Sequence, residues 1–232
     1  MMSAIARQHL LIDADDTLWE NNVYFEEAFD EFVDYLDHSS MSAAEVRAVL
    51  DEIELANIKI HGYGAANFAR NLAQCFERLA EREIRGEDLR VVRSFAERIL
   101  EHPIELIEGV EETLAYLAPR HELTLFTKGH AEEQRLKIDR SGLGPHFRHT
   151  AIVREKDAEA YASLARERGL DAGRTWMVGN SPKSDINPAL AAGLNAVYVP
   201  HPRTWGLERE EIQRANGRLL VLENFAELRA HF

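Results

Sequence analysis

The chain has 232 residues, of which 45% are hydrophobic and 29% charged, and its net charge is -13 at pH 7. This composition is typical of a globular protein with a hydrophobic core. The acidic balance argues against nucleic acid or an anionic membrane as a partner, because both bind basic surfaces. No apolar run approaches the roughly 20 residues of a membrane span. The single cysteine, Cys75, excludes an intrachain disulfide and a cysteine-based zinc site.

The first predicted strand, Leu10–Ile12, leads directly into an acidic turn. Asp13 and Asp15 stand two residues apart at the carboxyl end of this strand. This spacing can place one carboxylate to attack and another to exchange protons, and their shared charge favours a divalent cation. The alternative is a solvated acidic turn after a buried strand, because Asp is common in turns.

Residues 19–101 contain helical periods and no convincing strand. Ser42 and Glu45 have the spacing of a capping box, which predicts a helix from there through Ile58. The segment therefore predicts an all-helical insert. Its other indicators are the helically spaced Val23, Phe25, Phe29, Phe32, Val33 and Leu36, and the predicted helices Ala65–Glu83 and Glu87–Glu101.

From Gly109 onward, predicted helices alternate with predicted strands. This alternation favours an α/β fold with a doubly wound parallel sheet. We expect a core formed by residues 1–18 and 102–232, and a helical domain at 19–101. The predicted strands are Leu123–Phe126, Ala151–Val153, Thr175–Val178, Ala196–Val199 and Leu219–Leu222; the predicted helices are Val110–Leu117, one ending near Ser141, Asp157–Arg168, Pro188–Ala192 and Phe225–Ala230.

Polar side chains follow each of the next three predicted strands. They are Thr127 and Lys128, then Lys156, then Asn180 and Asp185. In a doubly wound sheet the carboxyl ends of the strands form the active-site crevice, so these groups should converge there. The chain has only five lysines, and the compact ammonium group suits contact with a single phosphoryl oxygen.

These segments, in this order, resemble the haloacid dehalogenase-like (HAD) hydrolase superfamily over essentially the whole chain. Asp13 and Asp15 match its first motif, Thr127 its second, Lys156 its third, and Gly179–Asp185 its fourth. The helical insert resembles the small cap of one large branch of the superfamily. The resemblance implies a Rossmann-like core with a small all-helical cap. It also implies a Mg2+-dependent phosphatase for a small-molecule phosphate monoester.

The chemistry of phosphoryl transfer assigns roles to the matched residues. Asp13 would attack phosphorus and form an aspartyl phosphate, while Asp15 would protonate the leaving oxygen and then deprotonate water. Thr127, Lys128 and Lys156 would contact the substrate phosphate. The alternatives are a helix-capping role for Thr127 and solvated positions for the two lysines.

The fourth motif departs from the family pattern, because Asn180 stands where the first Asp is usual. An amide oxygen can bind Mg2+ but supplies no charge. We expect the metal to be held by Asp13, by Asp185 and by the backbone carbonyl of Asp15. Asn180 should be among the ligands or next to them. Direct coordination by Asn180, replacement by water, and weak metal affinity all remain open.

Selectivity for the leaving alcohol should come from the helical insert, which would act as a lid. The glycine-rich stretch His61–Phe68 interrupts the helical pattern there, and it makes Tyr63 and Asn67 candidate substrate contacts. Trp19 could form the opposing wall. The alternative is a simple helix connector with its aromatic side chains packed inside.

Other functions share parts of this pattern. By resemblance, haloacid dehalogenases and phosphonate hydrolases lack an acid at the Asp15 position, and the latter need a cap lysine, for which Lys59 is the only candidate. A phosphomutase would share every core motif. A catalytically weakened binding module is the remaining alternative, with Asn180 as the sign of decay. We expect a cytoplasmic monomer or homodimer.

Overall fold

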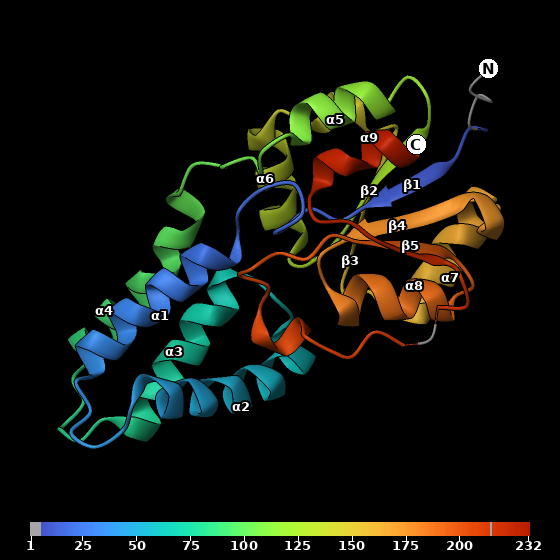
Figure 1. Cartoon of the computed structure of the whole chain (residues 1–232). Helices are drawn as coiled ribbons and strands as arrows, with labels where there is room; N and C mark the ends of the chain where they lie inside the picture. Colours follow the sequence, from blue (N-terminus) through green and yellow to red (C-terminus); the bar gives the residue numbers. More distant parts are fainter. Residues whose placement is uncertain (1–5, 214) are drawn as a thin grey trace. The chain divides into compact units, whose positions relative to one another are not determined.

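The computed structural model describes residues 6–213 and 215–232, and the chain forms two compact units (Figure 1). One unit comprises the chain up to Glu20 together with Ile104–Phe232, and the other is Asn21–Pro103. The expected boundaries, after residues 18 and 101, differ from these by two residues each. Within the described residues, no helix combines the length and the apolar character needed to cross a membrane.

The first unit is built on a parallel sheet, as predicted. Within the described residues six strands pair in the order β3-β2-β1-β4-β5-β6. The strand order reverses between β1 and β4, so the carboxyl ends of β1, β2 and β4 meet at a topological switch point. The strands are β1 (His9–Ile12), β2 (Glu122–Lys128), β3 (His149–Val153), β4 (Thr175–Gly179), β5 (Asn195–Tyr198) and β6 (Leu219–Val221).

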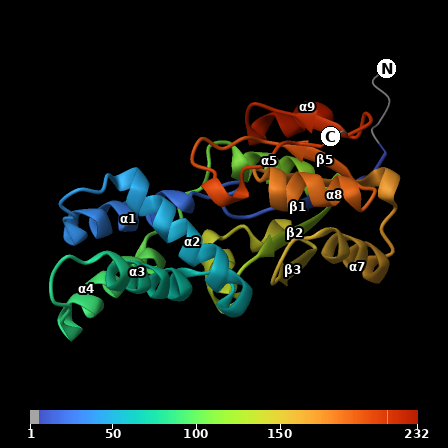
Figure 2. The same cartoon turned by 90° about the horizontal axis from the view of Figure 1, so that it is seen from below.

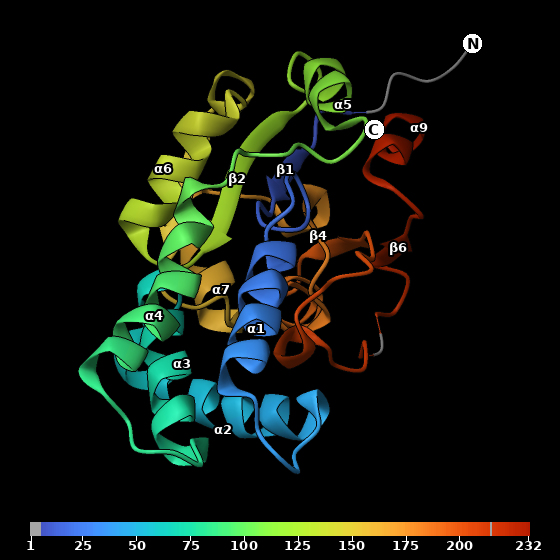
Figure 3. The ribbon, with the colours of Figure 1, turned by 90° about the vertical axis from the view of Figure 1, so that its left-hand side faces the viewer.

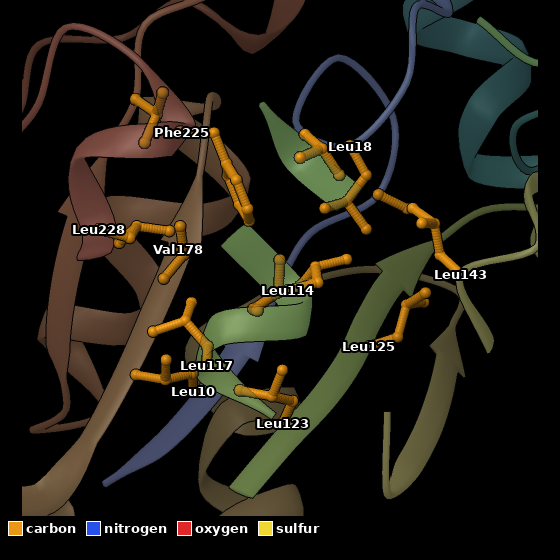
Figure 4. Close-up of a cluster of buried hydrophobic side chains, with 14 of the residues drawn as sticks. Leu10, Leu18, Leu114, Leu117, Leu123, Leu125, Leu143, Val178, Phe225 and Leu228 are labelled. Atoms are coloured by element: carbon orange, nitrogen blue, oxygen red, sulfur yellow. The ribbon is translucent and has the colours of Figure 1, made fainter. Parts of the chain in front are cut away.

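Helices cover both faces of the sheet (Figures 1 and 2). Because side chains alternate along a strand, Leu10 of β1 joins the cluster around Leu114, and Leu11 joins the cluster around Tyr161 on the opposite face. Figure 4 shows the first cluster, where Leu117 lies near Leu10. The helices are α5 (Val110–Leu117), α6 (Ala131–Ser141), α7 (Ala158–Arg168), α8 (Asn187–Ala191) and α9 (Leu228–His231).

The second unit is all-helical and has its own core (Figure 3). The core includes Phe32, Leu50, Leu72 and Phe76, each fully buried. Helix α3 packs against both α2 and α4. The predicted capping box at Ser42 is present, with hydrogen bonds in both directions. The helices are α1 (Asn22–Leu36), α2 (Ala43–His61), α3 (Ala65–Leu79) and α4 (Gly86–Glu97), and a 3-10 turn at Arg98–Glu101 follows.

Helix α3 is shorter than its sequence pattern predicts, because it ends at Leu79 instead of Glu83. Glu81 accepts hydrogen bonds from the backbone and the hydroxyl of Ser39, both at 2.7 Å. Arg82 pairs with Asp88 at 2.8 Å. These tertiary contacts draw the segment away from the helix axis and outweigh its intrinsic helix propensity.

Candidate active site

Asp13 stands at the switch point, immediately after β1, and is 7% exposed. Its backbone NH donates to the carbonyl of Val178 at 2.9 Å, which extends the pairing of β1 with β4 by one residue. Its Oδ1 accepts a hydrogen bond from Lys156 Nζ at 2.5 Å, and its Oδ2 accepts one from Thr17 Oγ1 at 3.0 Å. The carboxylate is therefore fixed in orientation at the carboxyl end of the central strand.

Lys156 bridges two buried carboxylates. Its Nζ donates to Asp13 and, at 2.8 Å, to Asp185 Oδ1, and all three residues are buried. Burial opposes the charge of Lys156, but the two carboxylates raise its pKa above the ordinary value. Burial, together with the neighbouring Asp185, raises the pKa of Asp13 to about 7 against the effect of Lys156. When both carboxylates are ionised, one ammonium leaves the cluster with a net negative charge.

Asp185 reaches this cluster by passing close over Gly179. A Cβ atom at Gly179 would lie 2.2 Å from Asp185 Oδ2, which is less than any real contact. The same Oδ2 accepts the backbone NH of Ser181 at 2.9 Å. The glycine before Asn180 is therefore required for the close approach of a side chain, since its φ is not in the left-handed region.

Asn180 presents its amide oxygen toward the acidic cluster. Its Nδ2 donates to Thr204 Oγ1 at 2.9 Å, and that hydroxyl donates to the carbonyl of His201 at 2.9 Å. Because the Thr204 proton is used on His201, the Thr204 oxygen must accept, and this fixes which end of the amide is nitrogen. The Asn180 Oδ1 lies 3.2 Å from the Thr17 hydroxyl, which also contacts Asp13.

These oxygens fit a Mg2+ ion by charge and by chemistry. The cluster offers the carboxylates of Asp13 and Asp185 and the amide oxygen of Asn180, all hard ligands of the kind Mg2+ prefers. Its net negative charge matches a divalent cation. With Asn in place of Asp, the site contributes one anion fewer.

A different group of ligand-type side chains lies beside the first motif. Within the described residues, ligand atoms of Asp16, Glu20 and His201 all lie within 4.8 Å of one another. The His201 ring is 3.4 Å from Glu20 and 4.0 Å from Asp16. None of the three was predicted as a metal ligand, and the fit of the cluster around Asp13 does not depend on them.

Asp15 is held by three side chains. Lys137 Nζ lies 2.6 Å from each carboxylate oxygen, Trp19 Nε1 donates to Oδ1 at 2.8 Å, and Gln134 Nε2 donates to Oδ2 at 3.1 Å. The Trp19 ring itself is fully buried, so it packs beneath the acidic turn. Trp19 therefore contacts Asp15 directly, in addition to any role as a wall of the substrate site.

The two side chains at the carboxyl end of β2 are engaged in separate networks. Thr127 is 1% exposed, and its hydroxyl accepts from Gln134 Nε2 at 2.7 Å. Lys128 Nζ instead lies 2.6 Å from Glu208 Oε1 and 2.8 Å from Ser184 Oγ. Burial opposes ionisation of Glu208, but Lys128 and two serine hydroxyls lower its pKa below the ordinary value. Lys128 thus ties β2 to the segment that carries Asp185.

The two remaining predicted substrate contacts belong to the helical unit. Tyr63 is half-buried in the connection between α2 and α3. Asn67 is 6% exposed and its Nδ2 donates to the carbonyl of Gly62 at 2.7 Å, which fixes that turn. The Asn67 Oδ1 is buried without a hydrogen-bond partner. A substrate role for either residue stays a prediction.

Three side chains at the site were not predicted from the sequence: Gln134, Lys137 and Glu208. Gln134 and Lys137 lie three residues apart on α6, which places them on one helix face. This spacing alone only weakly indicates a shared role. Glu208 comes from a 3-10 turn about 80 residues downstream of Lys128, as its contact with that lysine records. No local pattern predicts such a long-range pair.

Comparison with known proteins assigns the family. The model of haloacid dehalogenase-like hydrolases matches residues 8–193. A haloacid dehalogenase-like family hydrolase from Xanthomonas campestris is 31% identical, with a TM-score of 0.81, over 97% of this chain and 94% of that one. No sequence among the curated proteins matches.

More distant solved structures share the fold. The HAD-hydrolase YfnB of Bacillus subtilis, solved with magnesium bound, is 16% identical with a TM-score of 0.69, covering 98% of this chain and 99% of its own. A predicted phosphoglycolate phosphatase from Haemophilus somnus is 17% identical with a TM-score of 0.66, covering 100% and 99%. 2-Haloacid dehalogenases also match. The motif order, the parallel sheet and the family match together identify the chain as a member of the haloacid dehalogenase-like hydrolases.

Proposed function

We propose that this protein is a Mg2+-dependent phosphatase that hydrolyses a small-molecule phosphate monoester. The observation that carries the proposal is the buried Asp13–Lys156–Asp185 arrangement, with a second carboxylate, Asp15, two residues beyond the nucleophile. The similar structure with bound magnesium and the similar structure of a predicted phosphatase support it. We infer a phosphate ester as substrate because an anionic phosphoryl group needs fixed cations and hydrogen-bond donors, and Lys156 and Thr127 would supply them.

In the proposed reaction, Asp13 attacks phosphorus in line with the leaving oxygen and forms an aspartyl phosphate. Asp15 enters this step in its protonated form and gives that proton to the leaving oxygen, and the alcohol departs. Asp15 then takes a proton from water as the water oxygen attacks phosphorus, which releases inorganic phosphate and restores Asp13. Bound Mg2+ would offset the negative charge of the phosphoryl group and of Asp13.

The other polar side chains hold the phosphoryl oxygens or the carboxylates. Lys156 donates to Asp13 and to Asp185, and the one remaining ammonium proton can donate to a phosphoryl oxygen. The Thr127 hydroxyl accepts from Gln134, so its own proton can serve a second oxygen of the phosphoryl group. Asp13, Asp185, Asn180 and the Asp15 backbone carbonyl would bind the metal.

The competing activities are separated by single features. Dehalogenases are among the related structures, and the presence of Asp15 is the feature that favours phosphate ester hydrolysis instead. For phosphonate hydrolysis the candidate Schiff-base lysine, Lys59, is an exposed residue of α2, whereas an amine activated for that chemistry needs a desolvated site. A weakened binding module would not need Asp13, Lys156 and Asp185 together.

The test is hydrolysis of p-nitrophenyl phosphate with Mg2+ and with EDTA, with Asp13→Asn alongside. We expect activity that requires Mg2+ and is lost in the variant. Release of halide from 2-haloacids in place of phosphate would support the dehalogenase alternative. Transfer of phosphate within a sugar phosphate, without release of inorganic phosphate, would support a mutase. A screen of nucleotides, sugar phosphates and carboxylated phosphates would then name the substrate.

A further inference from the structure

The carboxylate of Asp15 receives more donors than a turn residue needs. Lys137 contacts both oxygens at 2.6 Å, and Trp19 and Gln134 each donate to one of them. Trp19 and Gln134 are buried, and the side chain of Lys137 is 15% exposed. The Asp15 side chain is 24% exposed, so water alone could solvate it. The protein donors instead restrict the carboxylate to one orientation.

Helix α6 is suited to deliver these donors. Gln134 and Lys137 lie on one face, three residues apart, and helical side chains tilt toward the helix N-terminus. That end of α6 follows β2, on the same edge of the sheet as Asp15. Gly129 leaves room for the glutamine: its φ is +141°, and a Cβ there would lie 3.2 Å from Gln134 Cγ.

Gln134 also connects two functional groups. Its Nε2 donates to Asp15 Oδ2 at 3.1 Å and to Thr127 Oγ1 at 2.7 Å. An amide nitrogen has two protons, so it can serve both acceptors at once. One side chain therefore fixes the spacing between the acid/base carboxylate and the hydroxyl assigned to the phosphoryl group.

We propose that Lys137 and Gln134 are positioning residues, which hold the Asp15 carboxylate where it meets the leaving oxygen. This inference rests on the proposed phosphatase function. Proton transfer in the transition state requires the donor within hydrogen-bond reach of the leaving oxygen, and a carboxylate free to rotate would spend less time there. Lys137 reaches Asp15 from the same face of α6 as Gln134, and we assign its effect to its contact with Asp15.

The inference predicts a dependence on the leaving group. An alkyl phosphate has a poor leaving group that needs a proton, whereas p-nitrophenolate departs readily without one. Lys137→Met should therefore lower kcat/KM for an alkyl phosphate such as glycerol phosphate at least about tenfold more than kcat/KM for p-nitrophenyl phosphate, a fraction of the total effect of general acid catalysis. This ratio excludes the later hydrolysis of the aspartyl phosphate, which is the same for both esters. Lys137→Arg should restore part of the loss.

The control is Arg135→Met on the same helix, because Arg135 is exposed and is not among the side chains that contact Asp15 or Thr127. A double-mutant cycle with Asp15→Asn adds a second test: once Asp15 can no longer donate a proton, Lys137→Met should cause no further loss for the alkyl ester. The indole Nε1–H of Trp19, which contacts Asp15, provides a readout independent of turnover. Its NMR cross-peak should move in Lys137→Met and stay in place in Arg135→Met.

Equal losses of kcat/KM for both esters in Lys137→Met, or additive losses in the cycle, would overturn the inference and leave Lys137 a structural residue. An unmoved Trp19 cross-peak would also overturn it. These results differ from failure of the proposed function, in which the wild-type protein and Arg135→Met would release no phosphate from any ester.

Discussion

Replacement of Asp13 by Asn should stabilise the metal-free protein at alkaline pH. The pKa of Asp13 is raised from 3.8 to about 7 because the group is buried beside Asp185. The folded state therefore binds more protons than the unfolded state between these values, and stability falls as pH rises through that window. The difference of about 3 pKa units corresponds to roughly 4 kcal/mol, at 1.36 kcal/mol per unit. Asn avoids this cost and leaves Lys156 paired with Asp185.

The assay is urea unfolding in EDTA at pH 5 and at pH 8.5. Near pH 5 the folded-state Asp13 is protonated but the unfolded-state carboxyl is already ionised, so the variant should be more stable by only about 1–2 kcal/mol. At pH 8.5 the variant should be more stable by up to about 4 kcal/mol. Asp139→Asn, an exposed position on α6, is the control and should show no such difference. A gain that is independent of pH, or a loss at pH 8.5, would refute the electrostatic reasoning.

Three further substitutions test other parts of the account. Gly179→Ala should displace Asp185, because the added Cβ would lie 2.2 Å from Asp185 Oδ2. We expect the Mg2+ affinity to fall in calorimetry and the free energy of unfolding to drop by about 1–3 kcal/mol. Gly206→Ala is the control and should change neither, because a Cβ there would meet no atom within 4 Å. Asn180→Asp should tighten Mg2+ binding by adding a charge next to Asp13, and weaker binding in the same titration would remove Asn180 from the metal site. Glu54→Gln should reduce the pH dependence of stability: burial raises the pKa of Glu54 from 4.5 to about 8, so the wild type should lose stability as pH rises from about 5 to 8, and the variant should keep only the smaller loss that Asp13 causes below about pH 7. A wild-type stability that is flat over this range would count against the buried charge. So would a pH slope of stability in Glu54→Gln as steep as that in Glu77→Gln, the exposed control.

The elements that the sequence predicted best are those with a strong local pattern. The alternation of apolar runs and helical periods after Gly109 predicted the parallel sheet, and the Ser42–Glu45 spacing predicted the start of α2. Helix α3 was predicted too long, because Glu81 and Arg82 have good helix propensity but make tertiary contacts that end the helix.

The candidate site divides along the same line. Asp13, Lys156 and Asp185 could be chosen from sequence because Asp13 directly follows β1 and the other two come shortly after β3 and β4, and the sheet topology brings them together. Lys137 and Glu208 could not, because their partners lie far away in sequence and nothing local distinguishes them from solvated charges. Lys128 was chosen for its position, yet its ammonium pairs with Glu208, a contact that only the folded chain creates.

The central claim is that Asp13 becomes phosphorylated during turnover. The most direct measurement is rapid acid quench of the enzyme with Mg2+ and a phosphate ester, followed by mass spectrometry of the peptides. We predict a phosphoryl group on Asp13, formed before steady state and absent in Asp13→Asn. Turnover with no phosphorylated enzyme at any quench time, or with the phosphoryl group on another residue, would contradict the account.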